Sequence, residues 1–298
     1  MIGWFGRPNK TFQIRFWKTV RQARFGHSQR SRLREMEGST LDLGTYLERI
    51  GITGRDLRPT VETLRQLHRQ HLLNVPFENL DIHWRRPIIL DTDRFFRKIV
   101  GERRGGFCYE LNGLFERLLA GVGFKTRLVS ARVFSGDAGF GPEFDHLAIL
   151  VTIGDREYLA DVGFGAFTSE PLEMTPDLEQ SDATGIFKIV GGDGSIDVCK
   201  LENGDWTPEY RFSTDGRELE EFNAMCEFHQ TSPDSHFTRR RICSMMTEIG
   251  RKTISGDRLI TTVDGNRTEV VIETDAELEI LLDREFGIVK FEGDIESV

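Results

Sequence analysis

The spacing of apolar residues changes near residue 123 of this 298-residue chain, and this change restricts the fold more than any other feature. In 60–73 the apolar residues recur every three or four positions, as on one face of an α-helix. After Gly123 they alternate with polar neighbours, at Val129, Ala131 and Val133, which is the two-residue period of a strand. A helical first third followed by mainly antiparallel strands predicts an α+β fold.

Capping residues mark where the helices begin and end. Asp91 can cap one helix with its side chain, and Gly101 can end it. Another helix begins where a glycine-containing turn reaches Cys108. We expect helices over five segments: 41–50, 60–73, 91–101, from about Cys108 to just before Gly121, and 275–286.

Strand and turn signals fill the rest of the chain. His146–Ile153 is a continuous apolar run of strand length. Asn203-Gly204 and Asp264-Gly265-Asn266 lie between strand-like runs, and both predict hairpin turns because Asn and Gly tolerate positive φ. The second turn is flanked by 258–263 and 268–273, which we expect to pair.

The charge is distributed unevenly along the chain. The formal net charge is −9, but the first 38 residues hold nine Lys and Arg against two Asp and Glu, so the other 260 carry −16. An acidic body repels a phosphate backbone, and no nucleic-acid partner is expected. The basic segment 1–38 is predicted to be a flexible extension, and Met36 is a candidate for the true start.

The cysteines and the longest apolar runs indicate the compartment. Four cysteines, in no CxxC pair, are typical of a reducing cytoplasm. The sequence has no run of about 18 apolar residues and no signal-peptide core, so neither a membrane span nor secretion is expected.

The segment 104–112, Arg-Gly-Gly-Phe-Cys-Tyr-Glu-Leu-Asn, places Cys108 at the start of a helix. The free N–H groups and the positive end of the helix dipole favour a thiolate there, which is the nucleophilic form of cysteine. Taken alone, such a cysteine is more often a small core residue. We interpret the other three cysteines, Cys199, Cys226 and Cys243, as packing residues.

A histidine and an aspartate fall at the ends of predicted neighbouring strands. His146 begins one apolar strand and Asp161 ends the next. If these strands are antiparallel neighbours, Asp161 can orient the imidazole and His146 can pair with Cys108. Each residue alone has a simpler explanation, a hydrogen-bonded structural histidine or a turn aspartate. Together the three predict a Cys-His-Asp triad.

A metal site is not expected. His68 and His71 share one helix face at i, i+3, but no Asp, Glu or Cys clearly completes the three or four ligands that zinc requires.

The combination of motifs resembles a known family. The segment 104–112 and the separations of 38 and 15 residues between Cys108, His146 and Asp161 are similar to the nucleophile signature and triad of the arylamine N-acetyltransferases. The segments 47–51, 75–80 and 232–237 also resemble family motifs, and the similarity covers roughly residues 39 to 298.

The resemblance implies a three-part architecture with a cysteine-protease-like catalytic core. A helical domain, 39–125, is expected to bear the nucleophile. An antiparallel β-barrel domain, 126–220, is expected to bear the histidine and aspartate. A smaller α/β lid, 221–298, is expected to follow.

The resemblance also implies a reaction and its site. Acetyl-coenzyme A would acetylate Cys108, and the acyl group would pass to the nitrogen of an arylamine or arylhydrazine, with no metal. Phe77, Phe164 and Phe237 match acceptor-pocket positions, and the backbone at Cys108 and Tyr109 is expected to supply oxyanion donors. Arg104 is expected to hold the turn by bonding carbonyls, with Glu110 and Asn112 bracing the same turn. The chain is expected to be a monomer or homodimer.

Other enzymes with the same three residues remain as alternatives. Cysteine hydrolases and transglutaminase-like enzymes use this triad on a peptide amide. An amide synthase would keep the triad and take its acyl chain from a carrier thioester. A non-enzymatic protein on a degenerate scaffold is disfavoured, because all three positions carry the required residue types.

Overall fold

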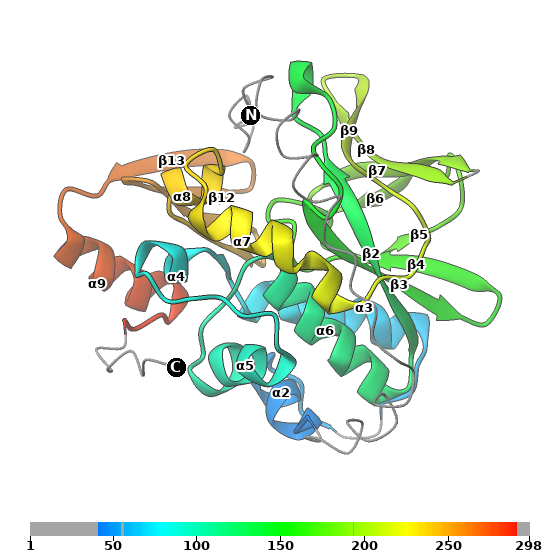
Figure 1. Cartoon of the computed structure of the whole chain (residues 1–298), viewed down its shortest axis with the longest axis horizontal. Coiled ribbons are helices and arrows are strands. Elements are labelled where there is room, and N and C mark those ends of the chain that lie inside the picture. The colour runs from blue at the N-terminus through cyan, green and yellow to red at the C-terminus, as the bar shows by residue number, and fades with distance from the viewer. Residues whose placement is uncertain (1–40, 55–56, 193, 291–298) are drawn as a thin grey trace.

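A computed structural model describes residues 41–54, 57–192 and 194–290. The basic segment 1–38 and Met36 lie outside the described residues. The order of elements confirms the α+β class, with helices first, then a large antiparallel sheet, and last a second sheet with its own helices (Figure 1).

The first third is helical, as predicted. Asp91 accepts a hydrogen bond from Arg94 N at 2.8 Å, the cap expected from the sequence. The helices are α2 (Leu43–Arg49), α3 (Val61–Asn74), α4 (Leu80–His83), α5 (Thr92–Phe96), a π-helical turn η1 (Arg97–Gly101) and α6 (Cys108–Val122).

The predicted end of α6 was wrong by two residues. The helix continues through Gly121 and ends at Val122, and Gly123 caps it with φ +103°. Gly121 is required for packing, because a Cβ there would lie 2.6 Å from the Leu43 side chain. The glycine therefore lets α2 approach α6 closely.

Eight antiparallel strands form the large sheet, in the order β5-β4-β3-β2-β9-β8-β7-β6. The side chain of Gln180 bonds the backbone of Glu173, donating to its carbonyl at 2.9 Å and accepting from its N–H at 2.7 Å, so the two edge strands meet and the sheet nearly closes into a barrel. The strands are β2 (Lys125–Val133), β3 (His146–Ile153), β4 (Arg156–Ala160), β5 (Leu172–Glu173), β6 (Gln180–Asp182), β7 (Gly185–Gly192), β8 (Ser195–Glu202) and β9 (Asp205–Phe212).

The second sheet combines distant parts of the chain. A two-residue strand from the helical third, β1, pairs with β10 at one edge, and helix α9 supplies the leucines that pack below. The pattern at 77–78 gave no strand signal because the segment is only two residues long. The elements are β1 (Phe77–Glu78), β10 (Ile242–Thr247), β11 (Gly250–Ser255), β12 (Arg258–Val263), β13 (Asn266–Val271) and α9 (Asp275–Phe286).

Both predicted hairpin turns are present. Asn203 and Gly204 have positive φ between β8 and β9. In the second hairpin only Asp264 and Gly265 form the turn, since Asn266 already pairs with Val263. The predicted start of the last strand at Thr268 was therefore two residues too late.

Two short helices connect the sheets. Helix α7 (Asn223–Thr231) and helix α8 (His236–Arg239) lie between the barrel strands and the second sheet (Figure 1). The 3₁₀ turn η3 (Leu219–Phe222) directly precedes α7, and another 3₁₀ turn, η2 (Gly136–Ala138), lies between β2 and β3.

Strand β3 explains how helices and barrel are joined. Leu147, Ile149 and Val151 face the helical core, whereas Ala148 and Leu150 face the barrel interior. Successive side chains of a strand point to opposite faces, so a strand that is covered on both faces becomes a continuous apolar run. The apolar run read from the sequence is thus a strand shared by two cores.

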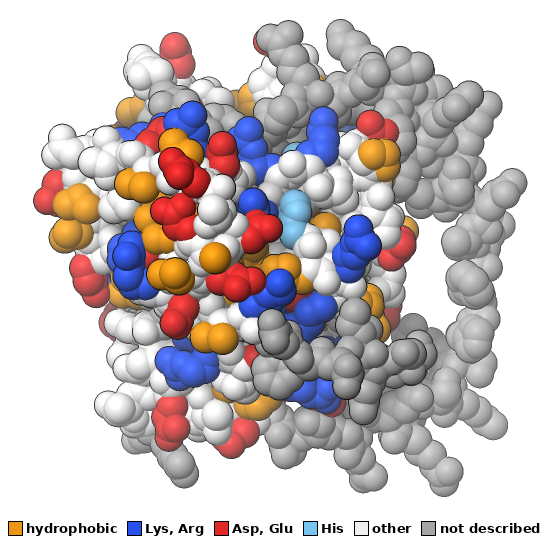
Figure 2. Space-filling view, turned by 90° about the vertical axis from the view of Figure 1, so that its left-hand side faces the viewer, with side chains coloured by type: hydrophobic (Ala, Val, Ile, Leu, Met, Phe, Trp, Pro, Cys, Tyr) orange, Lys and Arg blue, Asp and Glu red, His pale blue; other side chains and the backbone are white. Residues whose placement is uncertain are grey.

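The face that carries the second sheet mixes side chains of several kinds. Acidic and basic side chains are interspersed there, with scattered hydrophobic ones (Figure 2). None of the helices in the described part of the chain combines the length and apolar character needed to cross a bilayer.

Replacing Ile149 with Ala tests the importance of the shared strand. Ile149 is fully buried, and truncation leaves a cavity, so we expect a loss of about 2–5 kcal/mol of unfolding free energy in urea titration. Ile280→Ala on α9, where the side chain is 63 % exposed, is the control and should change stability by less than about 0.5 kcal/mol. Equal losses in the two variants would contradict the packing described.

Candidate active site

The start of α6 is packed directly against the segment before β1. A Cβ at Gly105 would overlap the carbonyl oxygen of Pro76, and Glu78 N donates to Gly106 O at 2.8 Å. These glycines are needed because two backbones touch. Cys108 follows as the first residue of α6, with its side chain buried.

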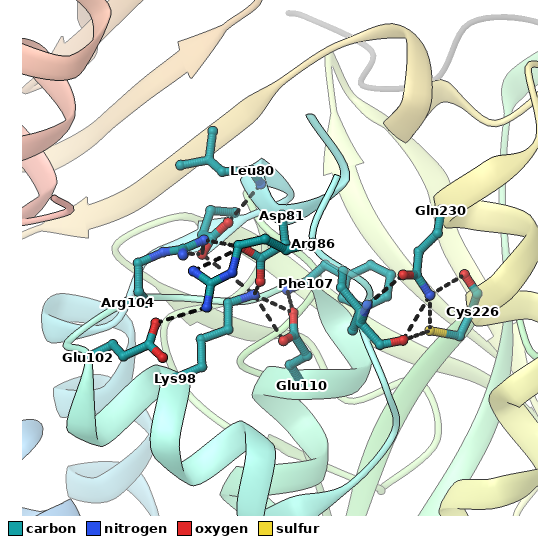
Figure 3. A network of polar contacts seen from close by, with 12 residues as sticks. Leu80, Asp81, Arg86, Lys98, Glu102, Arg104, Phe107, Glu110, Cys226 and Gln230 are labelled. Carbon is teal, nitrogen blue, oxygen red and sulfur yellow. Dashed lines mark hydrogen bonds and ion pairs between the residues drawn. The ribbon is translucent and has the colours of Figure 1, made fainter. Parts of the chain in front are cut away.

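A buried network of charges holds this turn (Figure 3). Arg104 donates to Glu78 Oε1 at 2.6 Å and to Asp81 Oδ1 at 2.9 Å. Lys98 Nζ lies 2.8 Å from Asp81 Oδ2 and 2.9 Å from Glu110 Oε1. Each charge has an opposite partner within hydrogen-bonding distance, which a buried ion requires.

Glu110 connects the network to the nucleophile turn. Its carboxylate accepts the N–H of Phe107, the residue that precedes Cys108, at 3.1 Å. Burial raises the pKa of Glu110 to about 7, because Lys98 offsets only part of the lost hydration. Glu110 thus braces the turn, as predicted.

The contacts predicted for Arg104 and Asn112 were wrong. Arg104 binds carboxylates, and Arg49 is the residue that donates to backbone carbonyls around this turn, including Ile99 O at 2.9 Å and Arg104 O at 3.2 Å. Sequence alone cannot assign which arginine faces which acceptor. Asn112 does not brace the turn but donates to Asp161 Oδ1 at 2.8 Å.

His146 and Asp161 form the expected pair. Strands β3 and β4 are antiparallel with Ile149 opposite Ala160, so Asp161 and His146 fall on the same face in diagonal positions. His146 Nε2 lies 2.7 Å from Asp161 Oδ2, and both side chains are buried. The other ring nitrogen, Nδ1, is left as the one through which the imidazole can exchange a proton with a thiol.

Asp161 is held by several donors besides His146. Gly163 N donates at 3.0 Å and Tyr210 Oη at 3.1 Å, in addition to Asn112. Burial alone would raise the pKa of Asp161, but His146 and these donors outweigh it and hold the pKa below its usual value. Tyr210, on β9, gave no sequence signal because it lies 49 residues from its partner.

The backbone brings Cys108 to this pair. The main chain of Leu147, next to His146, hydrogen-bonds the Cys108 thiol. A Cβ at Gly163, two residues after Asp161, would lie 2.9 Å from Cys108 Cα. The thiol therefore lies beside the strand ends that carry the imidazole and the carboxylate.

The surroundings of Cys108 oppose a charge on its sulfur. Burial raises the pKa of Cys108 well above its usual range, and the carboxylates of Asp145 and Asp161 raise it further. The Leu147 hydrogen bond lowers it only in part. A charged sulfur is therefore favourable here only beside a protonated imidazole.

The predicted aromatic residues fall into two groups. The rings of Phe77 and Phe237 are 6.1 Å apart, between the helical part and α8. Phe164 lies 5.0 Å from the ring of His146 and 5.1 Å from that of Tyr210, on the barrel side. The structure thus places Phe164 against the His146 ring and the other two around the Cys108 turn.

The two histidines considered as metal ligands have separate environments. His68 accepts the Asp161 N–H at 3.2 Å, and its other ring nitrogen lies 3.1 Å from Ser169 O. The ring of His71 packs 5.2 Å from Phe115. Within the described ranges, His, Cys, Asp and Glu side chains nowhere gather in a group of three that could hold a metal.

Comparison with known proteins identifies the family. A family model described as N-acetyltransferase matches residues 60–292. The chain is 31 % identical over 274 residues to the pineal gland arylamine N-acetyltransferase isozyme NAT-3 of Gallus gallus, covering 83 % of this chain and 94 % of that protein. The chain belongs to the arylamine N-acetyltransferase family.

Solved structures of arylamine N-acetyltransferases share the fold. The Salmonella typhimurium enzyme is 30 % identical, with a TM-score of 0.79 over 87 % of this chain and 94 % of that one. The Mycobacterium marinum enzyme, solved in complex with CoA, is 30 % identical, with a TM-score of 0.76 over 83 % and 93 %. The protein is thus an acyltransferase, and the family model covers the segments 75–80, 104–112 and 232–237.

The buried network predicts that part of the free energy of unfolding is lost at acid pH. Burial would raise the pKa of Asp81, but Lys98 and Arg104 lower it from 3.8 to about 2. A lowered carboxyl pKa contributes stability above pH 3.8, which is lost as the pH falls toward 2. Asp81→Asn should therefore be less stable than the parent by about 2 kcal/mol or more at pH 7, with the gap shrinking below pH 3.8.

Urea titrations at several pH values measure this gap. Asp275→Asn is the control, because this carboxylate also pairs with an arginine but its side chain is 87 % exposed. Its gap from the parent should stay near zero at every pH. A gap for Asp81→Asn that is as large at pH 3 as at pH 7 would contradict the role of the ionised carboxylate.

Proposed function

We propose that this enzyme transfers an acetyl group from acetyl-coenzyme A, through a thioester on Cys108, to the nitrogen of an arylamine or arylhydrazine. The observation that carries the proposal is the 2.7 Å His146–Asp161 pair beside a buried cysteine at a helix start. Family membership supports the acyl chemistry, and the CoA complex of the M. marinum relative supports the donor.

The first half-reaction loads the cysteine. As Cys108 Sγ attacks the thioester carbonyl, its proton passes to His146 Nδ1. The tetrahedral intermediate then breaks its bond to the sulfur of coenzyme A, and that sulfur takes the proton back from His146. Acetyl-Cys108 and free coenzyme A result, with the imidazole neutral again.

The second half-reaction unloads the cysteine. The amine nitrogen attacks the acetyl carbonyl of Cys108 and loses a proton to His146. The carbon–sulfur bond breaks, and Cys108 leaves as a thiolate that recovers the proton from His146. The amide product and the resting thiol are formed, so the reaction alternates between two enzyme forms.

Asp161 makes these proton transfers favourable. Its carboxylate bonds Nε2, fixes the ring with Nδ1 toward the thiol and stabilises the imidazolium that forms in each half-reaction. Asn112 and Tyr210 donate to the same carboxylate, which keeps it oriented. The raised pKa of the thiol makes this pairing necessary, since the sulfur ionises only as the ring becomes charged.

The first turn of α6 supplies candidate oxyanion donors. The N–H groups at a helix start have no intrahelical acceptor, and those of Cys108 and Tyr109 belong to this turn. Phe77, Phe237 and Phe164 are proposed to receive the aryl group of the acceptor.

We further propose that the protein is cytoplasmic and is a monomer or homodimer. Its proposed domains are the helical domain 39–125, the β-barrel domain 126–220 and the α/β lid 221–298.

Intact mass spectrometry tests the proposal. Incubation with acetyl-coenzyme A alone should add one acetyl group, and an arylamine or arylhydrazine should then remove it and yield the amide. Cys108→Ala should give no adduct, whereas Cys199→Ala, which removes a buried cysteine on β8, should still be acetylated.

Two results would count against this function. Coenzyme A release that survives Cys108→Ala would show that another group carries the chemistry. An adduct that water discharges as quickly as the amine does would indicate a hydrolase.

A further inference from the structure

A second histidine and carboxylate lie beside the Cys108 turn. His229 is on α7, 2 % exposed, and its Nε2 lies 3.3 Å from Asp145 Oδ1. Asp145 directly precedes His146 in the chain. Asp145 is therefore one residue away from the proposed triad in sequence. His229 comes from α7, whereas Cys108 is on α6.

Helix α7 is fixed in this position from both sides. Gln230, next to His229, accepts the Ile88 N–H at 2.6 Å and donates to Ile88 O at 2.9 Å (Figure 3). On the other side, His229 Nδ1 lies 3.4 Å from Ser235 Oγ, the cap of α8. The imidazole is thus held with its Nε2 toward Asp145.

The segment that carries Asp145 has an unusual backbone. Phe144 has φ +66°, a left-handed conformation that bulky residues rarely adopt. Tyr109 Oη donates to Phe144 O at 2.7 Å, and Phe144 N donates to Ser130 Oγ at 2.7 Å. Such strain persists only where the surroundings determine the conformation, and it is concentrated at functional sites. Here it fixes where the Asp145 carboxylate lies.

The carboxylate of Asp145 acts on the thiol. After burial, Asp145 is the largest contribution that raises the pKa of Cys108, ahead of Asp161. The carboxylate of Asp161 is turned toward the His146 ring, which takes up the thiol proton in the proposed reaction. Without a partner of its own, Asp145 would oppose every step in which Cys108 is ionised.

Other titratable and charged groups also surround the pair. From the neighbouring elements these are Cys108 and Tyr109 on α6, His146 and Asp161 on the barrel, Cys226 on α7, and His236 and Arg239 on α8. Burial, with His229 next, lowers the pKa of His236 to about 4, so its ring is neutral near pH 7. His229 is the histidine in contact with Asp145 and the one placed to offset its charge.

We propose that Asp145 and His229 form a second His–carboxylate pair that tunes the nucleophile, in which Asp145 opposes a negative charge on Cys108 and the contact with His229 offsets that opposition. The inference rests on the proposed function, since it assumes that ionisation of Cys108 matters. Neither residue touches the reacting atoms, so both are positioning residues. The stability of a charge on the Cys108 thiol therefore depends on the position of α7, which carries His229.

The rate of Cys108 alkylation by iodoacetamide, measured against pH on the full chain, tests this inference. Peptide mass spectrometry assigns the label to Cys108 among the four cysteines. Asp145→Asn should shift the midpoint of the profile down by about one pH unit, because a nearby like charge shifts a pKa by about 1–3 units. Reaction at pH 7 should then be up to about tenfold faster.

His229→Gln should act in the opposite direction. Glutamine keeps a hydrogen-bond donor but cannot carry a charge, so it cannot offset Asp145 and alkylation should slow by about three- to tenfold. The double variant should behave like Asp145→Asn, because His229 has no charge left to cancel. If the two residues had a purely structural role, the alkylation profiles of both single variants would shift in the same direction. Shifts of opposite sign would then not be seen.

Two control variants separate charge from general disturbance. His236→Gln alters the neighbouring ring, which is neutral, and Asp177→Asn removes a carboxylate that is 75 % exposed on the barrel. Both should leave the profile within about 0.2 pH units of the parent. Thermal melting of each variant checks folding, and if His229→Gln does not fold, the near-isosteric Asp145→Asn decides alone.

An unshifted profile for Asp145→Asn, or shifts of the same sign for both single variants, overturns the inference. Its failure is distinguishable from failure of the proposed function. Alkylation requires no acetyl donor, and acetylation of Cys108 is read separately by intact mass.

Discussion

The buried ion network at the start of α6 is the interaction on which the rest of the site depends. Five charges, on Glu78, Asp81, Lys98, Arg104 and Glu110, are enclosed where the helical part meets the second sheet. A buried ion pair adds little net stability over apolar packing, but removal of one partner leaves a charge without compensation. We infer that the network specifies a single geometry for the nucleophile turn.

Local patterns predicted much of the fold. Helix α9 begins and ends where its apolar period and caps place it, and Asn203-Gly204 forms a hairpin turn because both residues accept positive φ. The His146–Asp161 pair was also predictable, because strand alternation and a short connection place both residues on one face. Such features depend on residues close in sequence, where spacing carries the information.

Long-range contacts could not be predicted in the same way. Tyr210 binds Asp161 across 49 residues, and Arg49 takes the carbonyl contacts that were assigned to Arg104, 55 residues away. Pairings of this kind depend on how whole elements pack, which no local pattern encodes. The raised pKa of Cys108 is of the same kind, because it comes mainly from burial, and burial follows from tertiary packing.

The position of Cys108 between packed units has a chemical consequence. The thiol is surrounded by α6, the β3 strand that two cores share, and the charge of Asp145 next to α7. Burial in such a place disfavours a charge on the sulfur, so that charge depends on groups that other elements bring to it. Reactivity at Cys108 therefore depends on the helices, the barrel and α7 being packed together, so a packing change in any of them alters the nucleophile without touching it.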